Sequence, residues 1–363
     1  MNKLFKKYNF QYAVLSFLFL QILIHSVYGF TFKYNILGDF EIVQQLRQGS
    51  LSTSSYSADS PFYHIGAFLL KIDYFENYII YLTILTVLIQ LLIVLKISYL
   101  KKESLLFISA GWVVTVGWYV GNTDVLAVLL AIYLFDSVNK EENINWIKVF
   151  IFSSLLTFSH YGLAFFIIFS IVILLINENK KMLMPVSIFG YLFGRLIIQL
   201  YLNSFNYSGR SRFRFLFNDN ILNNTFNLTS SFFLNIILSG FLGMIMLLIL
   251  NTYNNSSQKN FRIYLSLAIS IIGTSIALDS SRVFSVIIVP LIYYLIIQYK
   301  KNIKLINQNF INSVPYLILI LSVFIGEQHV YGIINFESPN NLEPSMYNLF
   351  TTKVNSLMKN IWP

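Results

Sequence analysis

Short polar stretches interrupt an otherwise apolar chain, and the first of them pairs two carboxylates. GDFEIVQQLRQG contains Asp39, Glu41 and Arg47. Two carboxylates two residues apart can coordinate a divalent cation, which prefers oxygen ligands, or one of them can act as a general base on a hydroxyl group. The alternative is a solvated loop with a helix cap. We place Asp39 and Glu41 among the candidate catalytic residues and Arg47 among the candidate substrate-binding residues.

Two further stretches place an acid and an imidazole at breaks between apolar segments. In VGNTDVLAVLL the residues before Asp124 break one short helix from the next, and in LTFSHYGLAFF a tight turn contains His160. An aspartate in the first turn of a helix complements its dipole, so a structural cap is the alternative for Asp124. A histidine at such a boundary can be merely hydrogen-bonded, or it can serve as a phosphate donor or proton shuttle.

Arginines form the second kind of candidate site. GRSRFRF contains Arg210, Arg212 and Arg214, which share one face if the stretch is extended. Guanidinium forks suit phosphate oxygens, so the three residues are candidates for binding an anionic substrate. The alternatives are lipid headgroups or a local carboxylate such as Asp219.

Two isolated arginines extend this set. Arg195 lies within an apolar segment, where a charge is costly and usually functional, with snorkelling to the outer interface as the alternative. Arg282 in DSSRVF either binds an anion or simply pairs with Asp279.

Composition determines which elements must hold these residues. The chain of 363 residues is 56% hydrophobic with a mean hydropathy of +0.64 and only 11% charged residues, against about 25% in soluble domains. It is expected to be an all-α, polytopic transmembrane helical bundle, with residues 1–363 in a single integral-membrane domain. The net charge of +9 is spread over short loops and reflects their orientation, so no nucleic-acid partner is expected.

Metal chemistry is restricted by the residue types available. The chain has no cysteine and only four histidines, with no HExxH pair. Disulfides, thiolate metal sites and a cysteine nucleophile are therefore excluded. The cofactor is unknown: a divalent cation on oxygen ligands remains open, and no metal ligands are assigned.

Apolar runs predict about eleven spans, within a range of nine to twelve. We place helices at 10–30, 75–97, 104–120, 123–136, 147–160, 161–176, 184–202, 230–250, 261–278, 283–299 and 311–328. The pairs within 104–136 and 147–176 could each be one long helix. The first apolar run has no small-residue cleavage site and is expected to remain as a span.

Lysine and arginine distribution orients the bundle. Alternate short loops hold most of the basic residues, which predicts a cytoplasmic N-terminus and an outer C-terminus. The outer face then receives three long segments: 31–74 with an interfacial helix near 59–71, capped near Ser60 with Pro61 at its first position, the arginine-bearing loop 203–229, and the tail 329–363. The candidate stretches converge on this face.

Carboxylates and arginines beside the outer leaflet suit an anionic lipid with a polar acceptor, such as a polyprenyl-phosphate sugar or a polyprenyl-pyrophosphate oligosaccharide. In transfer from such a donor, arginine or a cation would stabilise the departing phosphate, and a carboxylate or His160 would take the proton of the acceptor hydroxyl.

These stretches resemble two groups of membrane enzymes. GDFE with YSADSPFYHI, and GNTDVLAVLL, are similar to the multi-spanning GT-C glycosyltransferases. FSHYG, the size and the helix count resemble the Wzy-type and EpsG-like polymerases of bacterial surface polysaccharides. The first likeness implies Asp39 as base or metal contact and Asp124 as a second acidic site. The second implies pyrophosphate binding by the arginines at 210, 212, 214 and 282, with His160 near them.

The chain departs from each of the two families in one respect. There is no large soluble C-terminal domain of the kind found in many GT-C enzymes, which favours a compact polymerase. The long arginine-bearing loops of the best-known polymerases are not clearly repeated, which weakens the polymerase assignment.

The expected function is glycosyl transfer in the assembly of a surface polysaccharide. The substrate would be an undecaprenyl-phosphate- or pyrophosphate-linked saccharide, used at the periplasmic face of the bacterial inner membrane among membrane lipids. An O-antigen repeat-unit polymerase is the first interpretation. A GT-C enzyme that adds a single sugar, and a flippase or transporter of lipid-linked sugars, are the alternatives. Transporters tend to have charged or broken helices near the midplane and internal repeats, and no repeat is visible here.

Overall fold

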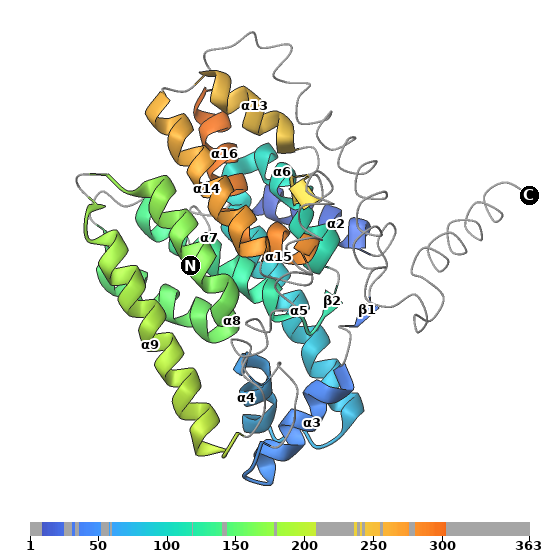
Figure 1. Ribbon diagram of the computed structural model, residues 1–363. Coiled ribbons are helices and arrows are strands. Elements are labelled where there is room, and N and C mark those ends of the chain that lie inside the picture. Colours follow the sequence, from blue (N-terminus) through green and yellow to red (C-terminus); the bar gives the residue numbers. More distant parts are fainter. Residues whose placement is uncertain are drawn as a thin grey trace, which may run out of the picture.

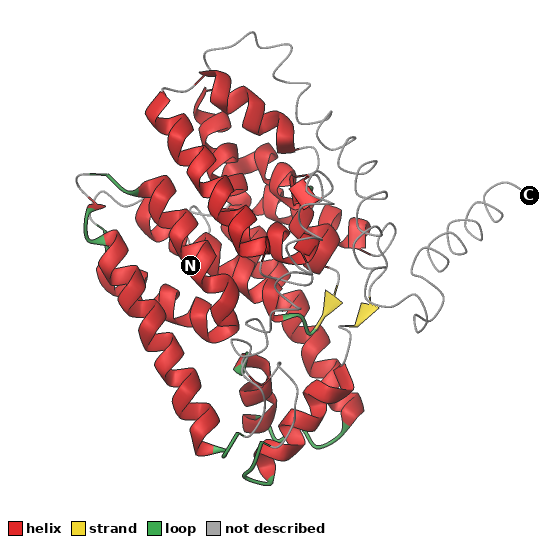
Figure 2. Ribbon diagram, in the orientation of Figure 1, coloured by secondary structure: helices red, strands yellow, loops and turns green. Residues whose placement is uncertain are grey.

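The computed structural model describes residues 9–24, 31–32, 36–51, 58, 60–117, 119–139, 144–177, 180–207, 236–237, 240–241, 244–254, 257–275 and 280–302. Over these residues the fold is all-α except for two short paired strands (Figures 1 and 2). The longer elements are α2 (Phe10–Ile22), α3 (Ile36–Arg47), α4 (Phe62–Leu69), α5 (Phe75–Ile97), α7 (Thr123–Asn139), α8 (Trp146–Leu175), α9 (Leu183–Ser204), α13 (Ile245–Asn254), α14 (Ser257–Ser275), α15 (Ser280–Ile287) and α16 (Val289–Asn302). The predicted span 311–328, the tail 329–363 and nearly all of the loop 203–229 lie outside the described residues.

Among the described residues, three helical stretches could cross a membrane when judged by length and composition alone: Phe75–Ile108, Trp146–Leu175, which is interrupted at His160, and Leu183–Ser204. Their outward surfaces are apolar as well. On α5 a stripe with a four-residue period, Ile80, Ile84, Leu88 and Leu92, is 43–56% exposed. Such a stripe covers one side of a helix and suits contact with lipid. These features support a membrane protein, and the count of eleven spans stays a prediction.

The chain reverses direction in the middle of α8. His160 has non-helical backbone angles (φ −162°, ψ 90°), so two helical segments meet there. Along the first segment, later residues of α8 contact later residues of α9: Phe150 lies against Gly190 and Ser154 against Gly194. Along the second segment the order is reversed, because Tyr161 lies against Arg195 and Phe165 against Tyr191. Each segment is about 22 Å long at 1.5 Å per residue, which is less than the hydrocarbon core of a bilayer. The predicted turn at His160 is therefore confirmed, and α8 is a helical hairpin.

Close packing of α8 on α9 depends on small residues. A Cβ atom at Gly190 would lie 2.7 Å from the Phe150 carbonyl oxygen, and one at Gly194 would lie 2.5 Å from the Ser154 carbonyl oxygen. Small residues let helices approach closely in lipid, where the hydrophobic effect does not drive their association. The hairpin is thereby held against α9 on one side, and against α7 on the other.

α7 is the centre of the described core. Nearly all of its side chains are buried, including Val125, Val128 and Phe135. It packs against α5, α8, α15 and α16. A helix that is apolar and buried on all sides lies inside a bundle, so polar residues at its two ends have little freedom to move.

Two predicted helices are wrong as drawn. The segment 104–120 is not one helix: α6 (Ser104–Ile108) ends early, a π-helical turn covers Val113–Gly117, and strand β2 (Tyr119–Val120) pairs in parallel with β1 (Thr31–Phe32). A side chain supports this irregular backbone, because Gln90 Nε2 donates to the Gly117 carbonyl oxygen at 2.7 Å.

The segment 283–299 is likewise divided, into α15 and α16. Pro290 lies at the start of α16, where its missing N–H group and its ring prevent the helix from running on unbroken from α15.

The segment 31–74, predicted to be a loop with one helix, has two helices among its described residues. Its first half forms α3, because Phe40, Val43 and Leu46 recur with helical spacing and are buried. The predicted interfacial helix is present as α4. Pro61 is its N-cap instead of its first residue, so the expected cap near Ser60 is one residue too early.

Candidate functional site

Asp124 is positioned by the turn that enters α7. Gly121 has φ +81°, a left-handed conformation that favours glycine, and a Cβ atom there would lie 2.9 Å from Leu82 Cδ1. Asn122 follows, and its Oδ1 accepts a hydrogen bond from the Asp124 backbone N–H at 3.1 Å. The helix cap is thus supplied by Asn122. The carboxylate of Asp124 is left available for other partners.

Those partners come from two distant elements. The Asp124 side chain is only 1% exposed; its Oδ1 lies 3.8 Å from His160 Nε2 and its Oδ2 lies 3.5 Å from Arg282 Nη1. The fold therefore brings together three residues that the sequence singled out separately. Exposure rises outward, from Asp124 to His160 at 14% and Arg282 at 30%. The two nitrogen donors lie on the accessible side, and the carboxylate lies behind them.

Hydrogen bonding assigns the proton on His160. Its Nδ1 accepts a hydrogen bond from the Leu163 backbone N–H at 3.3 Å, which also caps the second segment of the α8 hairpin. In the neutral ring the hydrogen is therefore on Nε2, which faces Asp124. This arrangement suits a donor to an anion better than a base, so it favours the phosphate-donor interpretation of His160.

A second acid–imidazole pair involves Asp39. His64 Nε2 lies 3.7 Å from Asp39 Oδ1, and both side chains are 4% exposed. Asp39 and Glu41 do not face the same site, because residues two apart on a helix point to different sides and Glu41 is exposed. Within the described residues no three His, Asp or Glu side chains gather at metal-binding distance.

α4 connects the two acid–imidazole pairs. Tyr63 precedes His64 on α4, and its hydroxyl donates to the Asn122 carbonyl oxygen at 3.2 Å. Burial raises the pKa of Tyr63, and the neighbouring Tyr81 and Asp124 raise it further. The Tyr63 hydroxyl thus stays protonated at neutral pH and remains a donor. Three of these residues were not proposed as site residues from the sequence: His64, Tyr63 and Asn122. A signal for the first two was present, because the predicted amphipathic helix contains one of the chain's four histidines directly after a tyrosine.

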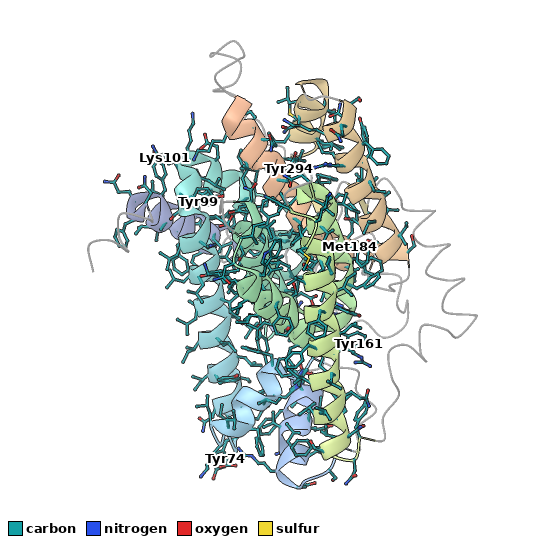
Figure 3. The ribbon with its side chains drawn as sticks, turned by 90° about the vertical axis from the view of Figure 1, so that its left-hand side faces the viewer. Tyr74, Tyr99, Lys101, Tyr161, Met184 and Tyr294 are labelled. Carbon is teal, nitrogen blue, oxygen red and sulfur yellow. The ribbon has the colours of Figure 1, made fainter. Side chains whose placement is uncertain are left out.

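The other candidate arginines lie elsewhere. Arg47, in the last turn of α3, forms an ion pair with Asp73, just before α5. Arg195 lies 4.2 Å above the ring of Tyr161, and its buried Nη1 has no hydrogen-bond partner among the described residues. In Figure 3, Tyr161 lies between two ends of the molecule, one marked by Tyr74 and the other by Tyr99 and Lys101. The three arginines of the loop predicted to be outside, Arg210, Arg212 and Arg214, lie beyond the described residues.

Comparison of the chain with protein-family models, with curated proteins and with solved structures finds no match.

Proposed function

We propose that the protein is an integral-membrane glycosyltransferase that takes sugars from an undecaprenyl-linked donor, as a repeat-unit polymerase of a bacterial surface polysaccharide. In this proposal it lies in the inner membrane with about eleven spans and a cytoplasmic N-terminus. The candidate residues then face the periplasm.

The observation that carries the proposal is the cluster of Asp124, His160 and Arg282. A guanidinium and an imidazole N–H that converge on the open side of a buried carboxylate form a ready site for a phosphate or pyrophosphate group. Buried ionisable groups inside a membrane bundle are costly to maintain and usually functional. The separations of 3.5 and 3.8 Å exceed hydrogen-bond length, which fits donors that shorten their contacts when an anion binds.

The reaction divides between the two acid–imidazole pairs. The acceptor hydroxyl oxygen forms a bond to the anomeric carbon of the donor sugar, and the bond from that carbon to the phosphate oxygen breaks. Asp39 takes the hydroxyl proton. Arg282 and the Nε2–H group of His160 stabilise the negative charge that develops on the departing lipid phosphate, and Asp124 holds both donors in place.

The resemblance to GT-C enzymes keeps the single-sugar transferase as a second candidate. It is favoured by the burial of Asp39 beside the interfacial helix α4, since Asp39 and Asp124 are the two residues to which that likeness gives a role. The two candidates share the donor chemistry and differ in the product.

The test is a transfer assay with the purified protein in liposomes. One set receives undecaprenyl-pyrophosphate-linked repeat units and another receives a polyprenyl-phosphate sugar with an acceptor. A ladder of elongated chains supports the polymerase, and addition of one sugar supports the single-sugar enzyme. Movement of lipid-linked sugars across the bilayer without any new glycosidic bond would reject both and favour a flippase.

Asp39→Asn is the matched variant for this assay. It keeps the shape of the side chain but cannot accept the hydroxyl proton, so transfer should be lost. Glu41→Gln, two residues away on the exposed side of α3, should transfer normally. Full activity of Asp39→Asn would remove Asp39 from the mechanism.

A further inference from the structure

Arg195 is a charged residue inside an apolar helix, and the reaction described above gives it no role. It lies nine residues before α9 ends at Ser204, which is about 14 Å along the helix axis. A charge at such a depth in a membrane helix is costly to maintain and by default indicates a function.

Arg195 lies at the border between two sides of α9. At about 100° per residue, Gly194 and Ile198 fall on one side of Arg195, and both are buried. Leu192 and Leu196 fall on the other side and are 56% and 53% exposed. This second side is apolar and suits contact with lipid.

The guanidinium group turns toward the α8 hairpin. Its Cζ lies 4.2 Å from the ring centroid of Tyr161, which is 3% exposed. A snorkelling arginine would extend its charge along the helix to the polar interface, whereas Nη1 of Arg195 is buried and has no hydrogen-bond partner among the described residues. The ring attracts the cation but offers no acceptor for its N–H groups.

A second buried donor of α9 also lacks a partner. The Tyr201 hydroxyl has no hydrogen-bond partner among the described residues, and its ring belongs to the same apolar cluster as Tyr161. Unpaired donors in apolar surroundings are costly unless a ligand supplies the acceptor. An anion fits this need, and a phosphate suits the planar guanidinium best.

The hairpin turn links Arg195 to the phosphate site. Tyr161 directly follows His160, whose Nε2 lies 3.8 Å from Asp124 Oδ1. The turn therefore has one residue beside the Asp124 cluster and the next beneath the Arg195 guanidinium. Arg195 is on the side of the turn that meets the exposed apolar surface of α9.

We propose that Arg195 binds the phosphate of the polyprenyl carrier beside the hairpin turn, with the apolar chain of the carrier on the exposed side of α9. The proposal rests on the proposed function, which brings a carrier phosphate to the depth of His160. Bulk phospholipids are not the occupant, because they keep their phosphates at the membrane surface, near the ends of α9.

Thermal unfolding in detergent tests this binding without any transfer. Undecaprenyl phosphate is the probe, and two lipids are its controls: undecaprenol, which has the same chain without phosphate, and phosphatidylglycerol, which has a phosphate on a bulk lipid. Undecaprenyl phosphate should raise the unfolding midpoint of the unsubstituted protein in a concentration-dependent way. Undecaprenol and phosphatidylglycerol should have little effect at the same concentrations.

Arg195→Gln should weaken the apparent affinity for undecaprenyl phosphate at least about tenfold, because charge-assisted hydrogen bonds to the phosphate are lost. Arg262→Gln, at a partly exposed arginine of α14, is the matched control and should bind normally. Equal affinity in Arg195→Gln and the unsubstituted protein would overturn the proposal. So would an equal response to phosphatidylglycerol, which would indicate a bulk-lipid contact.

Stability separates this role from packing on Tyr161. Without lipid, Arg195→Gln should unfold at the same temperature as the unsubstituted protein or higher, because a buried charge without a counter-charge is removed. A lower midpoint with unchanged lipid affinity would instead assign Arg195 to packing. Arg195→Lys keeps the charge but not the planar fork, and should bind undecaprenyl phosphate about threefold to tenfold more weakly. Should the glutamine variant not fold, unchanged affinity in the lysine variant would overturn the proposal.

The same proteins in the liposome transfer assay distinguish the two proposals. Lipid binding that depends on Arg195, in a protein that transfers no sugar, would reject the proposed function alone. Normal transfer together with lipid binding that ignores Arg195 would overturn the present proposal alone.

Discussion

α7 has a buried aspartate near each end, and the two are held in different ways. At Asp136 the contacts are short: the Tyr293 hydroxyl donates to Oδ1 at 3.0 Å, and Lys96 Nζ lies 3.2 Å from Oδ2. The Tyr99 and Tyr293 hydroxyls are in turn 2.8 Å apart. At Asp124 the nearest side-chain nitrogens, Arg282 Nη1 and His160 Nε2, are 3.5 and 3.8 Å away, and Oδ2 has no hydrogen-bond partner among the described residues.

We interpret this difference as that between a structural carboxylate and one that serves the proposed site. A buried charge with short, complete hydrogen bonds joins helices, in this case α5, α7 and α16, and has no capacity left for a ligand. At Asp124 the contacts to His160 and Arg282 are longer, and in the proposed function these two residues bind an anion. Burial alone would have ranked the two aspartates equally, at 1% and 3% exposure.

The largest expected effect is on transfer, from Asp124→Asn. The amide keeps the shape but no longer attracts His160 and Arg282, so the donors lose their placement at the departing phosphate. We expect kcat to fall on the order of 10³-fold in the liposome assay. The fold should persist, because the helix cap is supplied by Asn122. Normal kcat would contradict the assignment.

Arg282→Lys should have the next largest effect on transfer. Lysine keeps the positive charge but cannot present two parallel N–H groups to phosphate oxygens. We expect kcat/KM to fall about 100-fold, and we expect the same change at Arg262, on α14, to have little effect. Comparable losses in both variants would indicate a general charge effect.

Asp136→Asn should lower the stability of the protein and leave the rate of transfer nearly unchanged. Removing one partner of a buried pair costs about 3 kcal/mol, because Lys96 is left without its counter-charge. Thermal unfolding in detergent should show a clearly lower midpoint, while transfer per folded molecule stays within about threefold. Loss of transfer in the folded fraction would mean that this end of α7 also serves the reaction.

Gly121→Ala should have the smallest effect of this set. Alanine is strained at φ +81° and its methyl group would crowd Leu82, which together cost about 1–2 kcal/mol. We expect a modest fall in the unfolding midpoint and a measurable loss of transfer, since Asp124 follows three residues later. Gly49→Ala, also at positive φ (+75°) but with open space around it, controls for backbone strain alone.

Sequence patterns predicted the long helices and the turn at His160 well, because these features follow from local composition. α5 begins and ends where the apolar run does, and FSHYG marks the reversal between two apolar segments. The π-helical turn after α6 was missed, since it depends on contacts such as that of Gln90 with Gly117. The break before α16 was missed although Pro290 marks it in the sequence.

The site was predicted in its parts but not in its pairing. Asp124, His160 and Arg282 were each named from the sequence, but the sequence cannot show that His160 and Arg282 both lie near Asp124. Asp39 and Glu41 were grouped because they lie two residues apart in a segment predicted to be a loop, and the helix that forms there turns them to different sides. His64 drew no attention because its partner lies on a different element.

The most direct test is to measure transfer and unfolding of Asp124→Asn and Asp136→Asn side by side, in the same liposomes and detergent. The proposed account predicts a stable, inactive protein for the first substitution and a less stable protein with nearly normal transfer per folded molecule for the second. The reverse pattern, with transfer lost only at Asp136, would contradict the assignment of Asp124 to the phosphate site.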